Sequence, residues 1–203
     1  MDKRDKMVVF IGFLILVIAI IGVMYEEKGY TEAGKKEEKI TYAVDWEEET
    51  TSFQESGTVM KGEETTLTYS IDQEGLIEVE FRLEWSDNLA RGFLIPWNWS
   101  DIIDMKIDAP GSVEFSSNPV SGYKSPLVVK AKVGDIPSTM TINATNETEA
   151  WNIVSSYITK NGMGDWNAHI SIKTKPFFFD RGNDFTLFIT YKYYSPTLRE
   201  ISE

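Results

Sequence analysis

Carboxylate and amide side chains near the C-terminal end of the chain offer the oxygen ligands that a calcium ion requires. Asp180, Asn183 and Asp184 stand beside Gly182, and Asp165 lies in a neighbouring loop. Oxygen atoms of Asp and Asn are typical Ca²⁺ ligands, but their spacing here matches no EF-hand loop. Asx residues beside a glycine also form ordinary turns. The sequence therefore predicts a turn, with calcium as the alternative and as the only cofactor that these residues suggest.

Three Asn-x-Ser/Thr sequons, the acceptors for N-linked glycans, begin at Asn98, Asn143 and Asn146. A sequon of this kind is used in surface segments on the extracytoplasmic side of a membrane. Asn143 and Asn146 lie in a polar stretch, whereas Asn98 lies in an apolar one. We predict all three as candidate glycosylation sites and favour Asn143 and Asn146.

Groups for familiar catalytic chemistry are scarce. The chain has no Cys and a single His, His169, which excludes a Cys nucleophile, a Cys zinc site, a disulfide scaffold and a His pair for a metal. No motif gives His169 a Ser or Cys partner, and we assign it no role. Asp104 and Asp108 fall on the expected outward face of an alternating strand, where solvated carboxylates are the rule. We therefore predict that the chain is not an enzyme.

An apolar segment at residues 92–99, GFLIPWNW, lies between two expected strands, where loops are normally polar. Exposed apolar patches commonly mark interaction sites, so Phe93, Trp97 and Trp99 are candidate partner-binding residues. The alternative, which we favour, is that these side chains pack over the open end of the fold. The aromatic run at residues 177–179 poses the same question.

Charge and composition limit the partners. Asp and Glu number 32 against 20 Lys and Arg, for a formal charge of −12. Nucleic-acid binding depends on Lys and Arg that neutralise phosphates, so nucleic acid is a poor partner. Aromatic residues make up 13% of the chain, which is too rich in packing material for a disordered protein. A folded core is expected.

Residues 7–24 form an uncharged apolar run of 18 residues, which as a helix spans about 27 Å and matches a hydrocarbon core. We predict a transmembrane helix at 7–25. Lys and Arg residues flank the run on both sides, and the short tail at 1–6 favours a cytoplasmic N-terminus. A removed signal peptide and a pilin leader are the alternatives. Residues 26–39 have mixed charge and read as a stalk, either a coil or a helical extension of the span.

Alternating apolar and polar residues dominate the rest of the chain. At 76–85, Ile77 to Trp85 alternate strictly with Glu78, Glu80, Arg82 and Glu84, a period of two that predicts a half-buried strand. The pattern recurs in the ranges 40–46, 67–71, 103–107, 113–115, 127–133, 166–172 and 185–193. Residues 148–160 predict one short helix, with Thr148 as N-cap and Asn161-Gly162 as the end.

Without βαβ spacing, this alternation predicts an all-β fold, an antiparallel two-sheet β-sandwich of jelly-roll or Ig-like type with one short helix. We expect the sandwich at residues 40–194 and a C-terminal tail at 195–203.

The order of the segments LIEVEFRLEW, DIIDMKIDAPGSVEF, LVVKAKVGD, GDWNAHISIK and DRGNDFTLFITYKYY resembles that of a known group of sandwiches. These are the jelly-roll domains of the pre-peptidase C-terminal and proprotein-convertase P-domain kind, and similar domains occur in membrane-anchored archaeal surface proteins. The resemblance covers residues 65–194 and departs from the pattern at 86–100 and 135–163. It implies a noncatalytic accessory or binding domain, and it carries no catalytic residue to this chain.

We therefore expect a single-pass protein of the cell membrane, with a cytoplasmic N-terminus and an extracytoplasmic β-sandwich. The sandwich is expected to bind an envelope protein or a glycan. An accessory structural subunit of a larger membrane or surface-filament complex is the alternative. A carboxylate-based glycan hydrolase, which would need two carboxylates facing each other across a cleft, is the less favoured third interpretation.

Overall fold

A computed structural model describes residues 17–18, 39–86, 101–173 and 182–201. The chain divides into two compact units, Met1–Ile40 and Thr41–Glu203. In the first unit Val17 and Ile18 are helical. Across the described ranges, no helix is both long enough and apolar enough to cross a membrane. The span predicted at 7–25 is described only at those two residues.

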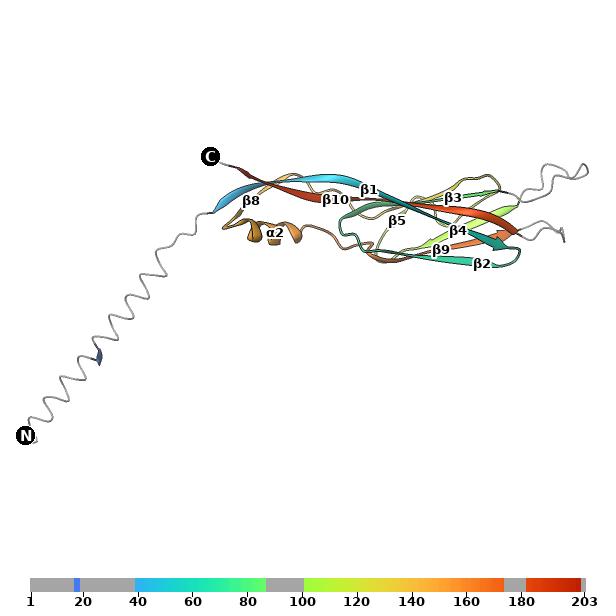
Figure 1. The fold of residues 1–203 in the computed structure, drawn as a ribbon, viewed down its shortest axis with the longest axis horizontal. Helices are drawn as coiled ribbons and strands as arrows, with labels where there is room; N and C mark the ends of the chain where they lie inside the picture. Colours follow the sequence, from blue (N-terminus) through green and yellow to red (C-terminus); the bar gives the residue numbers. More distant parts are fainter. Residues whose placement is uncertain (1–16, 19–38, 87–100, 174–181, 202–203) are drawn as a thin grey trace, which may run out of the picture. The chain divides into compact units, whose positions relative to one another are not determined.

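The second unit is an all-β fold of two antiparallel sheets with one helix in its described part (Figure 1). The six-stranded sheet has the order β5-β7-β3-β10-β1-β8, and the four-stranded sheet has the order β2-β9-β4-β6. The two-sheet antiparallel architecture predicted from the alternation is thereby confirmed. The elements are β1 (Ile40–Met60), β2 (Glu64–Ile71), β3 (Leu76–Ser86), β4 (Ile102–Asp108), β5 (Glu114–Phe115), β6 (Val120–Gly122), β7 (Leu127–Lys132), β8 (Met140–Ala144), α2 (Glu147–Ser155), β9 (Gly164–Lys173) and β10 (Gly182–Ile201).

The main core lies between the sheets and follows the period-two pattern. In β3, Val79, Phe81 and Leu83 are fully buried, while the Glu and Arg residues between them lie on the other face. In β9 the buried Trp166 packs against Phe81, with ring centroids 5.7 Å apart. Each such side chain contributes about 1.5–3 kcal/mol by leaving water, so β3 and β9 anchor the sandwich.

β1 and β10 form a long two-stranded ribbon that pairs without a register shift from Thr41↔Ile201 to Met60↔Gly182. The 20 residues of β10 span about 60–65 Å at roughly 3.3 Å per residue. We call the Thr41–Ile201 end proximal, since the segment 1–40 enters there, and the Met60–Gly182 end distal. β10 also pairs with β3 from Asp184↔Ser86 to Tyr193↔Leu76, so the sandwich occupies the distal part of the ribbon.

The ribbon buries opposite faces at its two ends. Toward the distal end odd-numbered residues such as Val59 and Phe185 face the main core, whereas toward the proximal end Tyr42, Val44 and Tyr194 are buried. Successive side chains of a strand point to opposite faces, so the proximal set forms a second, smaller core on the other face. β8 and α2 lie beside that part of the ribbon (Figure 1) and contribute the buried residues Ile142, Ala144, Ala150 and Val154.

Four local predictions differ from the structure. Helix α2 begins after Asn146, whose side chain accepts a hydrogen bond from the Glu149 N–H, so the N-cap prediction of Thr148 is wrong by two residues. The helix ends at Ser155 rather than at Asn161-Gly162. β10 continues to Ile201, so residues 195–201 belong to the ribbon instead of a separate tail. Their partner is β1, which itself extends to Met60 instead of ending at residue 46.

Candidate functional site

The favoured glycosylation sites lie at the proximal end, and both are exposed. Asn143 is in β8, and its Oδ1 accepts a hydrogen bond of 2.9 Å from the Thr41 hydroxyl. Asn146 caps α2 through Oδ1, and its Nδ2 donates to the Thr145 hydroxyl at 3.2 Å. A glycan is attached at Nδ2. The hydrogen bond between Asn143 and Thr41 uses Oδ1, so it does not engage the Nδ2 atom of Asn143. Asn98 lies outside the described residues.

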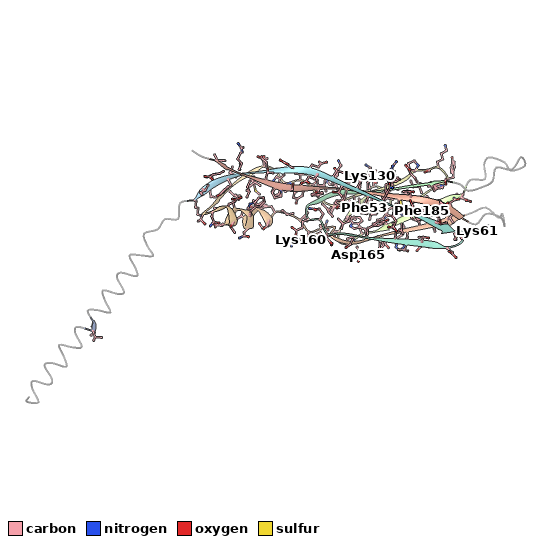
Figure 2. The ribbon with its side chains drawn as sticks, viewed as in Figure 1. Phe53, Lys61, Lys130, Lys160, Asp165 and Phe185 are labelled. Carbon is pink, nitrogen blue, oxygen red and sulfur yellow. The ribbon has the colours of Figure 1, made fainter. Side chains whose placement is uncertain are left out.

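The candidate calcium ligands do not converge where the structure describes them. Asn183 is buried and donates from Nδ2 to Asp101 at 3.2 Å, whereas Asp184 is exposed and accepts from the Thr58 hydroxyl at 2.7 Å. Asp165 pairs with Ser70 on the four-stranded sheet, away from the distal end where Figure 2 labels Lys61 and Phe185. Within the described ranges, no cluster of three or more His, Cys, Asp or Glu could hold a metal ion. Asp180 falls outside these ranges.

His169 lies on the outward face of β9 at the centre of a hydrogen-bonded row. Its Nδ1 is 3.0 Å from the Thr66 hydroxyl and 3.2 Å from a Glu64 carboxylate oxygen, and its Nε2 is 3.1 Å from Asp108. Lys106 pairs with Asp108 at 2.8 Å. The hydrogen bond from Lys106 holds the pKa of the Asp108 carboxyl below its ordinary value. Burial opposes this shift, and the charge of Lys106 and the hydrogen bond from His169 support it.

This row has the order hydroxyl, imidazole, carboxylate, but its surroundings do not support nucleophilic catalysis. Thr66 is in the first half of β2 and is paired with His169 of the neighbouring strand β9. Glu64 competes for the same imidazole nitrogen. Catalysis also requires donors aimed at a developing oxyanion, and the backbone N–H groups of paired strands are occupied by the sheet. Sequence reasoning missed the row, because only the register of three strands brings its members together.

Asp104 and Asp108 alternate with the buried Ile103, Met105 and Ile107 on β4, which confirms the predicted outward orientation. Each carboxylate has a lysine partner: Lys173 lies 2.7 Å from Asp104. Burial opposes ionisation of Asp104, but hydrogen bonds from Lys173 and Ser121 prevail and lower its pKa. Both groups are paired surface carboxylates, so neither is held neutral as a general acid would have to be.

The distal end of the ribbon carries a depression of about 640 Å³. It is lined by residues of β1, β3 and β10, including Ser86 at the end of β3, together with Ser125, which precedes β7. Gly57 lies there without a side chain, because a Cβ would come within 2.8 Å of the Phe185 ring. The polar lining consists of Ser56, Thr58, Ser86, Ser125 and Thr186 with the carboxylates of Glu84 and Asp184.

Hydrogen bonds across the ribbon hold this lining in place. Ser56 and Thr186 are 2.9 Å apart, and Thr58 donates to Asp184. The described lining residues include no Lys or Arg, so the surface suits neutral or cationic polar groups and disfavours anions. The predicted partner-binding residues Phe93, Trp97 and Trp99 lie outside the described residues, in the segment that joins Ser86 to Asp101.

Comparison with known proteins adds little to this geometry. No protein-family model matches the chain, and no curated protein matches it. Among solved structures, a crystal structure of FlhE is similar at 10% sequence identity, over 71% of this chain and 96% of that chain, with a TM-score of 0.32. A likeness at this level carries no argument about function. The case for a function therefore rests on the residues of the chain itself.

Proposed function

We propose that this protein is a membrane-anchored, extracytoplasmic and noncatalytic binding protein, whose β-sandwich contacts an envelope protein or glycan through its distal end. The observation that supports the proposal is the distance along the ribbon between the residues that follow the apolar run and the polar depression. The segment with the apolar run precedes Thr41, and the polar depression lies about 50 Å away along the same paired strands.

The sequence supplies the membrane side of the proposal. Residues 7–24 are uncharged and apolar, which is typical of a membrane-spanning helix. Basic residues flank the run on both sides, and the cytoplasmic N-terminus is part of the proposal. Because the ribbon starts directly after the stalk at 26–39, its rigid length extends the reach of the anchored chain. The jelly-roll pattern similar to pre-peptidase and P-domain sandwiches belongs to the same proposal and favours a binding module over an enzyme.

The chemistry of the distal end indicates the kind of partner. Hydroxyl groups and carboxylates line the depression, and such groups hydrogen-bond to sugar hydroxyls or to polar and basic protein surfaces. The aromatic residues predicted for contact, Trp97 and Trp99, belong to the adjoining segment of the sequence. Aromatic rings beside polar groups are common at recognition sites, where they supply contact area and orientation.

The test is to extract the tagged full-length protein from its native membrane in mild detergent and to identify what co-purifies by mass spectrometry. Ser86→Lys places a long cation in the depression, and Ser70→Lys is the matched control on an exposed strand at another place. We expect a stoichiometric envelope protein or glycan to be lost with Ser86→Lys and retained with Ser70→Lys. Equal recovery with both variants, or the absence of any partner, would overturn the proposal.

A further inference from the structure

β1 carries an open sheet edge beyond the short strand that covers its beginning. β8 has five residues and β1 has 21. Side-chain hydrogen bonds tie the β8 region to β1 at Thr41 and Trp46. Among the described residues, the sheet order gives β1 no neighbour other than β8 on this side. The backbone groups of residues 47–57 that point away from β10 therefore form an edge at which another strand can pair.

A row of aromatic rings lies beside this edge and runs from β2 past β1 to β10. Phe53 of β1 contacts Tyr69 of β2 and Tyr191 of β10, with ring centroids 5.2 and 6.2 Å apart. Tyr193 continues the row 6.0 Å beyond Tyr191. Phe53, Tyr191 and Tyr193 are only partly buried, so the row ends the main core and is accessible beside the open edge. Figure 2 labels Phe53 in the middle of the described fold.

Carboxylates stand at both ends of this aromatic row. Tyr69 donates to Glu55 at 2.9 Å, and Tyr193 donates to Glu49 at 2.8 Å. Ser195 also donates to Glu49 at 2.6 Å. The hydrogen bonds from Ser195 and Tyr193 lower the pKa of Glu49, so its carboxylate is ionised at neutral pH. Glu49, Phe53 and Glu55 share one face because they are separated by even numbers of residues.

We propose that this aromatic row and the open edge of β1 together bind an extended, Lys- or Arg-rich segment of an envelope protein, which adds to the sheet as a further strand. Such a segment would hydrogen-bond to the backbone of residues 47–57, as in other cases of strand addition. Cations at every second position would face the rings and the carboxylates together. The proposal rests on the binding role proposed above and adds a second contact, along the edge of β1, to the one at the distal depression.

The negative charge of β1 favours a basic segment over a second copy of this chain as the added strand. β1 contains Asp45, Glu47, Glu48, Glu49 and Glu55 and no Lys or Arg. Two such strands side by side would set like charges against each other, which is unfavourable in a sheet. A basic strand would meet opposite charges along the same edge. The tilted ring planes, at 42° and 67° to the Phe53 ring, also offer no flat platform for sugar stacking.

Binding is tested with the full-length protein in detergent micelles and a fluorescent peptide of alternating Lys and Thr residues. The variant E49Q/E55Q removes two charges and keeps acceptors for both tyrosines, and D72N/E114Q removes the same charge elsewhere on the surface. We expect E49Q/E55Q to weaken binding, measured by fluorescence anisotropy, by about fivefold or more, as two exposed charge pairs would. D72N/E114Q should change it less than twofold.

Hydrogen exchange provides the second readout. Bound peptide should slow amide exchange within residues 47–57, and a peptide of the same composition with its lysines in one block should do so less. Equal weakening in both double variants, or unchanged exchange in 47–57, would overturn the inference. Binding of chitohexaose that E49Q/E55Q abolishes would overturn it in favour of a glycan.

The outcomes also separate this inference from the proposed function. If the peptide binds as expected but native membranes yield no partner, the docking chemistry is supported and the envelope role fails. If a partner is recovered and E49Q/E55Q retains it fully, the inference fails and the proposed function stands.

Discussion

Replacing Trp166 by Phe tests whether the core of the sandwich depends on one buried hydrogen bond as well as on packing. The Trp166 side chain is fully buried, and its Nε1 donates to the Gly162 carbonyl at 2.8 Å. Phe keeps an aromatic ring near Phe81 but removes the donor. A buried carbonyl left without its donor costs about 1–2 kcal/mol, and the smaller ring forfeits about 1–2 kcal/mol of packing. The expected loss is therefore about 3 kcal/mol.

The measurement is urea and thermal unfolding of the full-length protein, followed by far-UV circular dichroism. For a domain of this size, about 3 kcal/mol corresponds to a fall in Tm of roughly 6–12 °C. Trp151→Phe is the matched control: Trp151 is 40% exposed on α2, and its Nε1 lies 3.3 Å from surface Glu147. We expect a change within about 0.5 kcal/mol there. The reasoning is refuted if the two variants unfold at the same midpoint with unchanged m.

Three further predictions concern other positions. Gly182→Ala should destabilise the fold by about 2 kcal/mol or more in urea unfolding, since φ is +137° and a Cβ would stand 2.2 Å from the Val59 carbonyl oxygen. Asn146→Ala should lower the unfolding free energy by about 1 kcal/mol because α2 loses its N-cap. Glu49→Gln should make the unfolding free energy less dependent on pH in the acidic range. Hydrogen bonds lower the folded pKa of Glu49, so its contribution is present above the unfolded pKa of about 4.3 and disappears as pH falls through the folded value.

Each of these has a control and a contradicting result. Gly62 has φ +76° but open space around a Cβ, so Gly62→Ala should cost less than Gly182→Ala, and the reverse order would contradict the steric argument. Asn146→Ser keeps a capping oxygen and should retain most of the stability that Asn146→Ala loses. For Glu49, the urea midpoint is measured at pH 6 and at pH 3 in the wild type and in Glu49→Gln. If the midpoint falls by the same amount in both proteins, the hydrogen bonds of Glu49 do not contribute to stability.

The sequence predicted the strands that have a strict apolar face and missed those that lack one. β3 was evident because Val79, Phe81 and Leu83 alternate with charged residues. The second half of β1 reads EEETTSFQESGTVM and has few apolar residues, because its hydrogen-bonding partner is β10 and one side remains an edge. Short β8 was missed for a similar reason: it contributes only Ile142 and Ala144 to the small proximal core.

The side-chain clusters that the structure shows on the sheet surfaces depend on contacts between residues that are distant in sequence. His169 meets Thr66 and Asp108 through the register of β2, β9 and β4, and no local pattern encodes a register. The aromatic row around Phe53 likewise joins residues from three strands. The helix cap was misplaced because Asn146 and Thr148 are both good capping residues, and the choice between them follows from which residue α2 buries first, namely Ala150.

The unbroken register of β1 and β10 also determines how the protein responds to mechanical load. If the chain is held in the membrane before Thr41 and a partner pulls at the distal end, the force runs parallel to the strands. The hydrogen bonds from Thr41↔Ile201 to Met60↔Gly182 are then loaded side by side in shear, instead of one after another as in a zipper. Rupture then requires many of them to break together, so a protein anchored and loaded in this way would have a ribbon that resists extension.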